Sequence, residues 1–202
     1  MAAGMDIVGV TRELEISQVE AAYRAGVFPM ADIEHGVFTW HCPDPRAILP
    51  LDGFHVSRSL RRTERRAGFE VSFDRDFAAV MRACAADRPV WINDDFHRIY
   101  GALHAQGKAH SVEVWREGAL VGGTYGVQVG GAFCAESKFH RVTDASKVAL
   151  HALVDRLRER EFLVLDVQYL TPHLETLGAV EIPAREYMRL LDRAVRLNCE
   201  FG

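Results

Sequence analysis

Three strand-like stretches joined by very short turns constrain the fold of this chain more than any other feature. They occupy about residues 110–116, 119–128 and 131–138, and apolar residues recur along each of them. The dipeptides Glu117-Gly118 and Gly130-Gly131 separate them. Because a two-residue loop can join only antiparallel neighbours, this segment predicts three strands connected by hairpins.

Helix and strand patterns flank these hairpins. A strand over 69–73 and two amphipathic helices, capped by Asp74 and by Asn93 or Asp94, are predicted before them. The elements predicted after them are the longest helix (145–160, opened by Asp144), a strand (162–168), a helix started by Thr171-Pro172, a strand near 179–182 and a last helix from Ala184.

The resulting order, β-α-α-β-β-β-α-β-α-β-α, resembles that of the GNAT (N-acetyltransferase) fold. We therefore predict an α+β protein whose GNAT-like C-terminal domain, residues 57–202, contains a mixed sheet. Residues 1–56 are predicted to form a small, loop-rich N-terminal domain. In it, the capping-box pattern Ser17-Gln-Val-Glu20 favours a helix over 17–25, and prolines interrupt residues 27–56.

Several classes of protein are disfavoured. The interval 139–144, where GNAT enzymes carry a glycine-rich loop for the coenzyme A pyrophosphate, contains no glycine. Four widely spaced cysteines without a C-x-x-C pair argue against a zinc ribbon and a disulfide framework. No apolar run is long enough for a membrane span, and no secretory signal is visible. We expect a cytoplasmic protein with neither a metal nor a cofactor.

One segment is strongly basic. In residues 57–66, SRSLRRTERR, five arginines and one glutamate give +4, whereas the whole chain carries −4, so the remainder carries −8. Helical spacing puts the arginines along one side of a helix. Such a stripe is either a solvated surface or a site that captures and orients a polyanion which the rest of the protein repels. The arginines are Arg58, Arg61, Arg62, Arg65 and Arg66.

Polar residues interrupt two apolar strands. Asp166 and Gln168 fall on the same side of the strand FLVLDVQ, where they either form a site or emerge into solvent at the strand end. Glu136 lies in the segment FCAESKF, and alternation places it on the face opposite Phe133. Both could line one pocket only if the strand is bulged.

Two tryptophans stand near turns. Trp40 precedes Cys-Pro-Asp-Pro-Arg, and Trp91 lies between Pro89 and Asn93. Each is either a core residue or a surface on which an unpaired RNA base stacks.

Taken together, these segments resemble the bacterial leucyl/phenylalanyl-tRNA–protein transferases. The resemblance extends over about residues 17–187, in collinear blocks that include WHCPDPRAIL (40–49), HSVEVWREGALVGGTYGV (110–127), FCAESKF (133–139) and LDVQ (165–168). It implies an aminoacyltransferase that takes Leu, Phe or Met from aminoacyl-tRNA. The amino acid would be joined to the N-terminal amine of proteins that begin with Arg or Lys, which marks them for degradation. A monomer that uses neither metal nor coenzyme A is expected.

The resemblance also implies residue roles. Trp40 and Trp91 would flank the terminal adenosine, and the arginine stripe would touch the tRNA acceptor stem. Glu136 would bind near the aminoacyl ester, and Asp166 and Gln168 would act on the acceptor amine. Phe133 and Leu165 would line the pocket for the donor side chain.

Three positions depart from the family pattern. Thr124 and Lys138 stand where methionines are usual, and Leu153 stands where a pocket phenylalanine is frequent. Because Thr124 and Leu153 would alter the volume and polarity of the pocket, two other hypotheses stay open. One is an aminoacyltransferase with another donor or a small-molecule acceptor, and the other is a non-catalytic tRNA-binding module.

Overall fold

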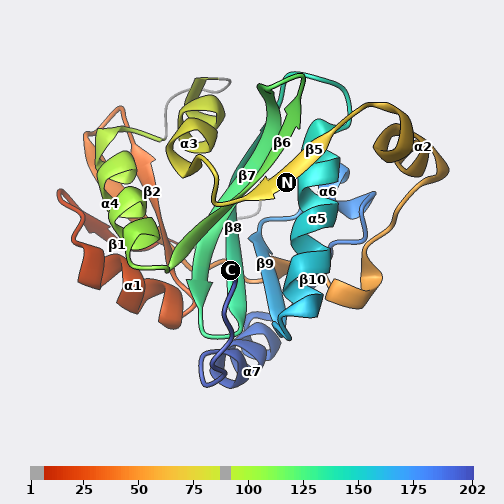
Figure 1. Cartoon of the computed structure of the whole chain (residues 1–202). Coiled ribbons are helices and arrows are strands. Elements are labelled where there is room, and N and C mark those ends of the chain that lie inside the picture. The colour runs from red at the N-terminus through yellow and green to blue at the C-terminus, as the bar shows by residue number, and fades with distance from the viewer. Residues whose placement is uncertain (1–6, 87–91) are drawn as a thin grey trace.

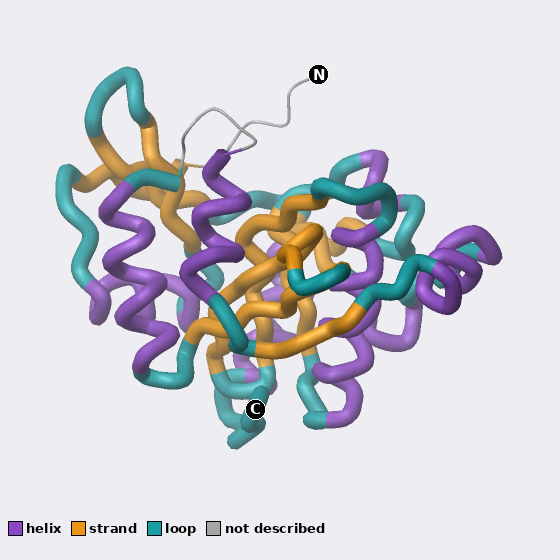
Figure 2. The backbone as a smooth tube through the Cα atoms, turned by 45° about the horizontal axis from the view of Figure 1, so that its top comes forward, coloured by secondary structure: helices purple, strands orange, loops and turns teal. Residues whose placement is uncertain are grey.

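The computed structural model describes residues 7–86 and 92–202. Its strands form two sheets, a three-stranded sheet with the order β1-β3-β2 and a seven-stranded sheet with the order β10-β4-β9-β8-β7-β6-β5. Figures 1 and 2 show the small sheet at one side of the large one.

The small sheet is built from the first fifth of the chain. It comprises β1 (Ile7–Thr11), β2 (Phe28–Asp32) and β3 (Val37–His41), all antiparallel, with α1 (Ile16–Arg24) between the first two strands. This region, predicted to be loop-rich, thus contains more regular structure than the sequence indicated. Short strands of this kind, one of them containing a proline, have too few residues to show a period-2 pattern.

The predicted capping box at the start of α1 is also absent. The N-cap residue is Glu15, whose side chain makes no capping hydrogen bond, so Ser17 lies inside the first turn of the helix. The apolar face that buries Val19 and Tyr23 holds this helix in place instead.

The large sheet begins earlier in the chain than predicted. β4 (Arg46–Ile48) lies between β9 and β10 in that sheet, although the predicted N-terminal domain includes these residues. α2 (Arg58–Arg66) follows, and the Ser57 hydroxyl caps it by accepting a hydrogen bond from Leu60 N–H.

The element order predicted from residue 69 onward is confirmed. The elements are β5 (Glu70–Phe73), α3 (Phe77–Ala86), α4 (Asp94–Ala105), β6 (Ala109–Arg116), β7 (Ala119–Val129), β8 (Ala132–His140), α5 (Ala145–Glu159), β9 (Val164–Gln168), α6 (Pro172–Glu175), β10 (Val180–Ile182) and α7 (Ala184–Ala194).

The predicted helix caps have different outcomes. Asn93 caps α4 and Thr171 caps α6, as expected. In contrast, the Asp74 carboxylate binds the His110 ring and Ser111 N–H, and Asp76 accepts the hydrogen bond from Ala79 N–H in the first turn of α3. A nearby side chain can replace the predicted cap because many groups near a helix start accept hydrogen bonds.

The large sheet is mixed, as predicted, because β8 and β9 pair in parallel and the other neighbours are antiparallel. One hydrophobic core joins the sheet to α1, α3, α4 and the small sheet, and a second joins it to α5. Figure 1 shows these helices on opposite sides of the central strands.

The parallel pairing of β8 and β9 is short. It includes Phe133 with Leu165 and reaches Cys134 with Asp166. Next along β8, Tyr125 of β7 faces Ser137 and Gly126 faces Ala135, so Glu136 is the extra residue of a bulge. A Cβ atom at Gly126 would overlap the Cys134 carbonyl oxygen, so the two backbones approach closely here. A bulge redirects side chains, and here it lies where the two strands stop pairing.

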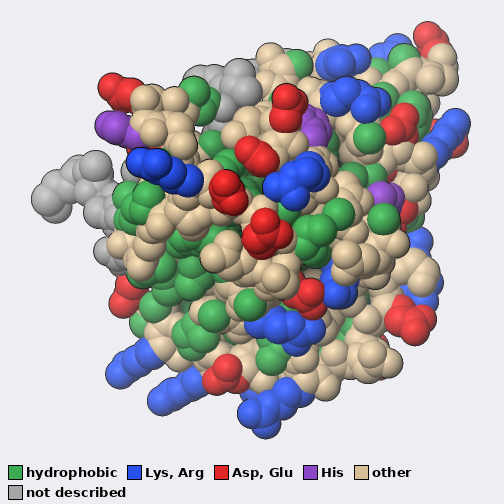
Figure 3. All heavy atoms as spheres, turned by 90° about the vertical axis from the view of Figure 1, so that its left-hand side faces the viewer, with side chains coloured by type: hydrophobic (Ala, Val, Ile, Leu, Met, Phe, Trp, Pro, Cys, Tyr) green, Lys and Arg blue, Asp and Glu red, His purple; other side chains and the backbone are tan. Residues whose placement is uncertain are grey.

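The face that carries the small sheet shows apolar groups among charged ones (Figure 3). Val8 and Val10 of the edge strand β1 are 59% and 62% exposed.

Among residues 7–86 and 92–202, none of the helices has the length and apolar character needed to cross a bilayer.

Candidate active site

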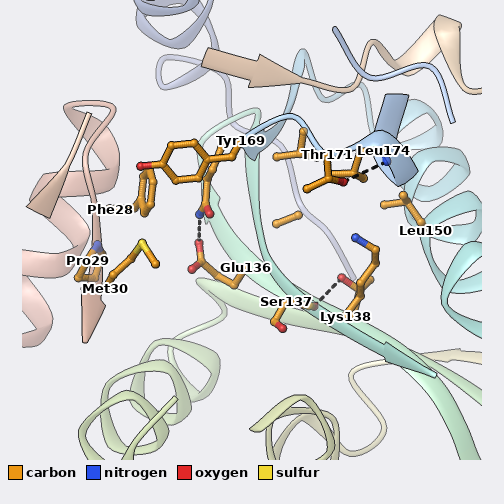
Figure 4. A pocket seen from close by; sticks show the side chains of 14 residues that line it. Phe28, Pro29, Met30, Glu136, Ser137, Lys138, Leu150, Tyr169, Thr171 and Leu174 are labelled. Atoms are coloured by element: carbon orange, nitrogen blue, oxygen red, sulfur yellow. Dashed lines mark hydrogen bonds between the residues drawn. The ribbon is translucent and has the colours of Figure 1, made fainter. Parts of the chain in front are cut away.

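A cavity of about 210 Å³ opens between the small sheet and the splayed ends of β8 and β9. Phe28 and Met30 of β2 form one side of it, and Leu150 of α5 and Leu174 of α6 form the other (Figure 4). The polar residues Glu136 and Gln168 lie between these apolar sides. The cavity therefore presents a few polar groups inside a largely apolar lining, which is typical of a binding site for a small group.

Glu136 and Gln168 are joined directly. Gln168 Nε2 donates a hydrogen bond to Glu136 Oε1 at 2.8 Å, and the pair spans the gap between β9 and β8 (Figure 4). Tyr100 donates to the other Glu136 oxygen at 3.3 Å, and the Tyr100 and Tyr23 hydroxyls lie 2.7 Å apart. A chain of polar groups thus runs from the cavity wall into the core.

The titration of Glu136 is strongly perturbed. Burial raises its pKa to about 7, although hydrogen bonds from Tyr23 and Tyr100 act in the opposite direction by favouring the carboxylate. Burial also raises the pKa values of Tyr23 and Tyr100 well above their usual range, so both phenols stay neutral donors. A carboxyl group with a pKa near neutrality can accept and return a proton under physiological conditions.

Asp166 has a different environment. It is 0% exposed and does not line the cavity. Arg46 holds it with two hydrogen bonds, at 2.9 and 2.6 Å, and the Tyr187 hydroxyl adds a third at 2.7 Å. The backbone N–H of Gln168 supplies a fourth at 2.8 Å. Because two carboxylate oxygens accept about four hydrogen bonds, this carboxylate has no position left for a substrate amine.

Asp166 therefore fixes the backbone of Gln168 rather than its side chain. Gln168 has a φ of +64°, and Tyr169 N–H donates to the Val167 carbonyl at 2.8 Å across it. This tight turn holds a non-glycine residue in the left-handed region, where such residues are uncommon. It directs the Gln168 amide toward Glu136, so the predicted pairing of Asp166 with Gln168 acts through the main chain.

Arg46 is a site-supporting residue that sequence reasoning missed. It is 1% exposed, donates to the Gly26 carbonyl at 3.0 Å, and lies over the rings of Phe28 and Tyr187 at 4.8 and 4.6 Å. In the sequence, Arg46 stands out only as an isolated charge in the short apolar segment Arg46–Leu49. Its partner Asp166 is 120 residues away in the chain, so the pair could not be recognised from local sequence.

The predicted residues of the donor pocket separate into two groups. Thr124 lines the cavity and donates to the Ser137 carbonyl at 2.9 Å. Phe133, Leu153 and Leu165 are at most 1% exposed and belong to the core on the α5 side, outside the cavity lining. Phe133 stacks instead on Phe201, with ring centroids 5.5 Å apart. The bulge begins only at Glu136, so alternation before it still turns Phe133 to the opposite face.

Trp40 does not line the cavity in the structure. Trp40 is 8% exposed, belongs to the core beneath the small sheet and faces Gly9 of β1 and Pro29 of β2. Little of this side chain is in contact with solvent, and its stacking on an adenosine stays a prediction. Trp91 lies outside the described residues.

The predicted arginine stripe is present on α2. A shallow surface hollow of about 600 Å³ is lined by Arg58, Arg61, Arg62, Arg65 and Arg66. Leu60 is buried on the opposite side of the helix, and Glu64 binds the His151 ring at 2.6 Å, so α2 is anchored to α5 with its arginines facing outward. Among the described residues, no three His, Cys, Asp or Glu side chains converge as a metal ion would require.

Nearly the whole chain matches the models of one protein family. Residues 48–192 match the family model for leucyl/phenylalanyl-tRNA protein transferase, and residues 12–44 match the model for the N-terminal domain of that family. The chain is 50% identical over 193 residues to a leucyl/phenylalanyl-tRNA–protein transferase from Herpetosiphon aurantiacus, covering 95% of this chain and 100% of that protein. A transferase of the same name from Ruegeria pomeroyi is 53% identical, covering 89% and 86% of the two chains.

Solved structures give a weaker likeness. A ribosomal-protein-alanine N-acetyltransferase from Brucella melitensis superposes with a TM-score of 0.38 and 19% identity, covering 54% of this chain and 84% of that one. The mixed sheet is thus established by the strand pairing, and the GNAT-like classification stays a prediction.

Proposed function

From the premise that this chain belongs to the leucyl/phenylalanyl-tRNA protein transferase family, we propose that the cavity between β2, β8 and β9 is its reaction centre. The enzyme transfers an amino acid from its tRNA to the N-terminal amine of a protein. The observation that carries the location is the Gln168–Glu136 hydrogen bond at the cavity wall, together with the near-neutral pKa of Glu136.

The lining favours an apolar donor side chain. Met30, Leu150 and Leu174 supply apolar surface on both sides of the cavity. Thr124 donates its hydroxyl proton to the Ser137 carbonyl and does not demand a polar partner from the ligand. This is consistent with leucine, phenylalanine and methionine as donors.

The reaction needs alignment and the removal of one proton. The acceptor nitrogen attacks the carbonyl carbon of the aminoacyl ester, a C–N bond forms, and the bond from that carbon to the ribose oxygen breaks. The nitrogen loses a proton, and the leaving ribose oxygen gains one. Because the ester is already activated, placing the amine against it supplies much of the rate enhancement.

Glu136 is suited to move this proton. An α-amino group has a pKa near 8, close enough to the pKa of about 7 of Glu136 for transfer in either direction. Glu136 takes the proton from the acceptor amine and returns one to the ribose oxygen. The Gln168 amide holds Glu136 in position and offers its carbonyl oxygen to the amine. Asp166 and Arg46 act as positioning residues for Gln168.

The remaining parts of the proposal concern partners. The arginines of α2 bind the phosphates of the tRNA, because a net charge of +4 in that segment contrasts with −8 elsewhere. The acceptors begin with Arg or Lys, whose cationic side chains suit the acidic remainder of the protein. Transfer would mark these acceptors for degradation. A monomer acting in the cytoplasm suffices for this chemistry.

The test is direct transfer. Purified protein is incubated with tRNA charged with Leu, Phe or Met and with a reporter peptide that begins with Arg, and the peptide mass is measured. A mass increase of one donor residue supports the proposal. Deacylation without peptide product, or tRNA binding without any reaction, would instead favour another acceptor or a non-catalytic module.

A further inference from the structure

A second, larger hollow adjoins the reaction cavity. It has a volume of about 570 Å³, and we call it the Lys147 pocket after one of the residues that line it, which include Lys138, His140, Asp144, Lys147, Thr171 and His173. Lys138 and Thr171 also line the reaction cavity, so the two hollows share a wall. Figure 4 shows these two residues at the side of the cavity away from Phe28.

The Lys147 pocket has a positive electrostatic character. Two lysines line it against the single carboxylate of Asp144, and the other ionisable side chains in the lining are the imidazoles of His140 and His173. Lys147 binds that carboxylate at 2.8 Å, and the Thr63 hydroxyl donates to it at 3.2 Å, so its charge is compensated. Burial lowers the pKa of His173, and the charges of Lys138, Lys147 and His140 lower it further. His173 is therefore uncharged at neutral pH, and the positive charge of the pocket comes from Lys138 and Lys147.

The pocket also adjoins the arginine surface. Thr63 lies on α2 among the arginines, and its hydrogen bond to Asp144 connects α2 to the rim of the Lys147 pocket. Figure 1 shows α2 near the end of α5 at which α5 begins. The order along the surface is thus the arginines of α2, the Lys147 pocket and the reaction cavity.

We propose that the Lys147 pocket binds the phosphodiester groups directly preceding the terminal adenosine of aminoacyl-tRNA. This inference rests on the proposed function and extends it, because it assigns a path between the acceptor stem and the reacting ester. A single strand that crosses from α2 to the reaction cavity meets cations at each step. The acceptor peptide is excluded from this pocket, because its cationic N-terminal side chain would be repelled there.

The experiment compares donors that differ in phosphate content. The donors are a 3′-aminoacyl adenosine without phosphate, the aminoacylated trinucleotide CCA and full aminoacyl-tRNA. The test variant is Lys147→Met, which removes a positive charge and keeps the side-chain length. We expect its KM to rise about tenfold for the trinucleotide and for tRNA relative to the phosphate-free donor, with kcat unchanged. Lys147→Arg should restore the wild-type ratio.

Two controls separate this effect from general ones. Arg189→Met changes an exposed cation on α7, at the end of the molecule opposite the start of α5 (Figure 1), and should leave the donor ratio unchanged. Arg61→Met with Arg62→Met should raise KM for full tRNA alone, because the trinucleotide does not reach α2. Thermal unfolding of each variant verifies that it is folded.

Binding supplies a readout that does not depend on transfer. Calorimetry with uncharged CCA and with adenosine should show tighter binding of the trinucleotide by the wild type and loss of that preference in the test variant. The inference is overturned if the wild type binds CCA and adenosine with equal affinity. It is also overturned if the pocket binds an acidic peptide in place of the trinucleotide. Wild-type protein that prefers the trinucleotide and transfers nothing to a peptide would contradict the proposed function and leave the phosphate path standing.

Discussion

The side-chain amide of Gln168 lies 2.8 Å from Glu136 Oε1, and this hydrogen bond connects two parallel strands at the point where their main chains have stopped pairing. The strands separate because Glu136 occupies a bulge and Gln168 a tight turn. The two irregularities create the space in which the cavity lies, and the bond between them controls the orientation of both side chains.

The pH dependence of transfer should follow Glu136. As a base, it must be deprotonated, so the transfer rate should rise through pH 7, and deprotonation of the acceptor amine, with a pKa near 8, should extend the rise before the rate levels off. Glu136→Gln preserves the shape and should lower the rate by about 10²–10⁴-fold while tRNA affinity stays the same. Single-turnover rates between about pH 5.5 and 9 measure this. If the transfer rate of the Glu136→Gln variant still rises near pH 7, Glu136 is not the group that titrates there.

The same carboxyl group should reduce stability at high pH. Its folded pKa of about 7 lies above the 4.5 of a solvated glutamate, so the folded state binds more protons between these values. The free energy of unfolding contributed by this group therefore falls as the pH rises from about 4.5 to 7, by about 1–3 kcal/mol. Glu136→Gln should be more stable than the wild type at pH 8 and show no advantage at pH 4.5. Urea unfolding at the two pH values decides this, and an equal difference at both would contradict it.

Removing the charge of Asp166 should destabilise the fold. Asp166→Asn leaves the buried Arg46 guanidinium without its ion partner, and we expect a decrease of about 3–5 kcal/mol in unfolding free energy. The matched control replaces both partners, Arg46→Met with Asp166→Leu, and should recover part of the stability but not the transfer activity. Denaturant titration and the transfer assay are read together. A stable Asp166→Asn variant would show that the ion pair carries little of the folding energy.

The turn at Gln168 allows a matched pair of substitutions. Gln168→Gly and Gln168→Ala both delete the amide, and both should abolish transfer. Glycine adopts a positive φ without strain, so the glycine variant should be more stable than the alanine variant by about 1 kcal/mol. Thermal unfolding tests this difference. If alanine proved equal or better, the left-handed backbone would not be a constraint at this position.

The arginine surface should determine the salt dependence of tRNA binding. Arg61→Ala with Arg62→Ala should weaken binding and reduce the slope of log K against log salt by about one unit for each phosphate that is no longer neutralised. Arg185→Ala with Arg189→Ala removes two exposed charges from α7 and serves as the control. Affinities measured from about 50 to 300 mM salt should separate the two variants. Parallel salt slopes would mean that the α2 arginines are only a solvated surface.

Local sequence signals predicted the order of elements from residue 69 onward. The Glu117-Gly118 and Gly130-Gly131 turns delimit three strands, and Asn93 and Thr171 cap the helices they precede. Each of these features depends on a few neighbouring residues, so it can be recognised without knowing the rest of the structure. The arginine face of α2 follows from helical spacing in the same way.

Tertiary structure alone decided how the site is assembled. Arg46 and Asp166 are 120 residues apart and meet because β4 inserts beside β9, a pairing that no local pattern encodes. The same long-range packing buries Trp40. The sequence determined which residues are polar in an apolar strand. Only the packing of distant segments decided that Glu136 faces the cavity with a near-neutral pKa while Asp166 is fully buried and neutralised by an arginine.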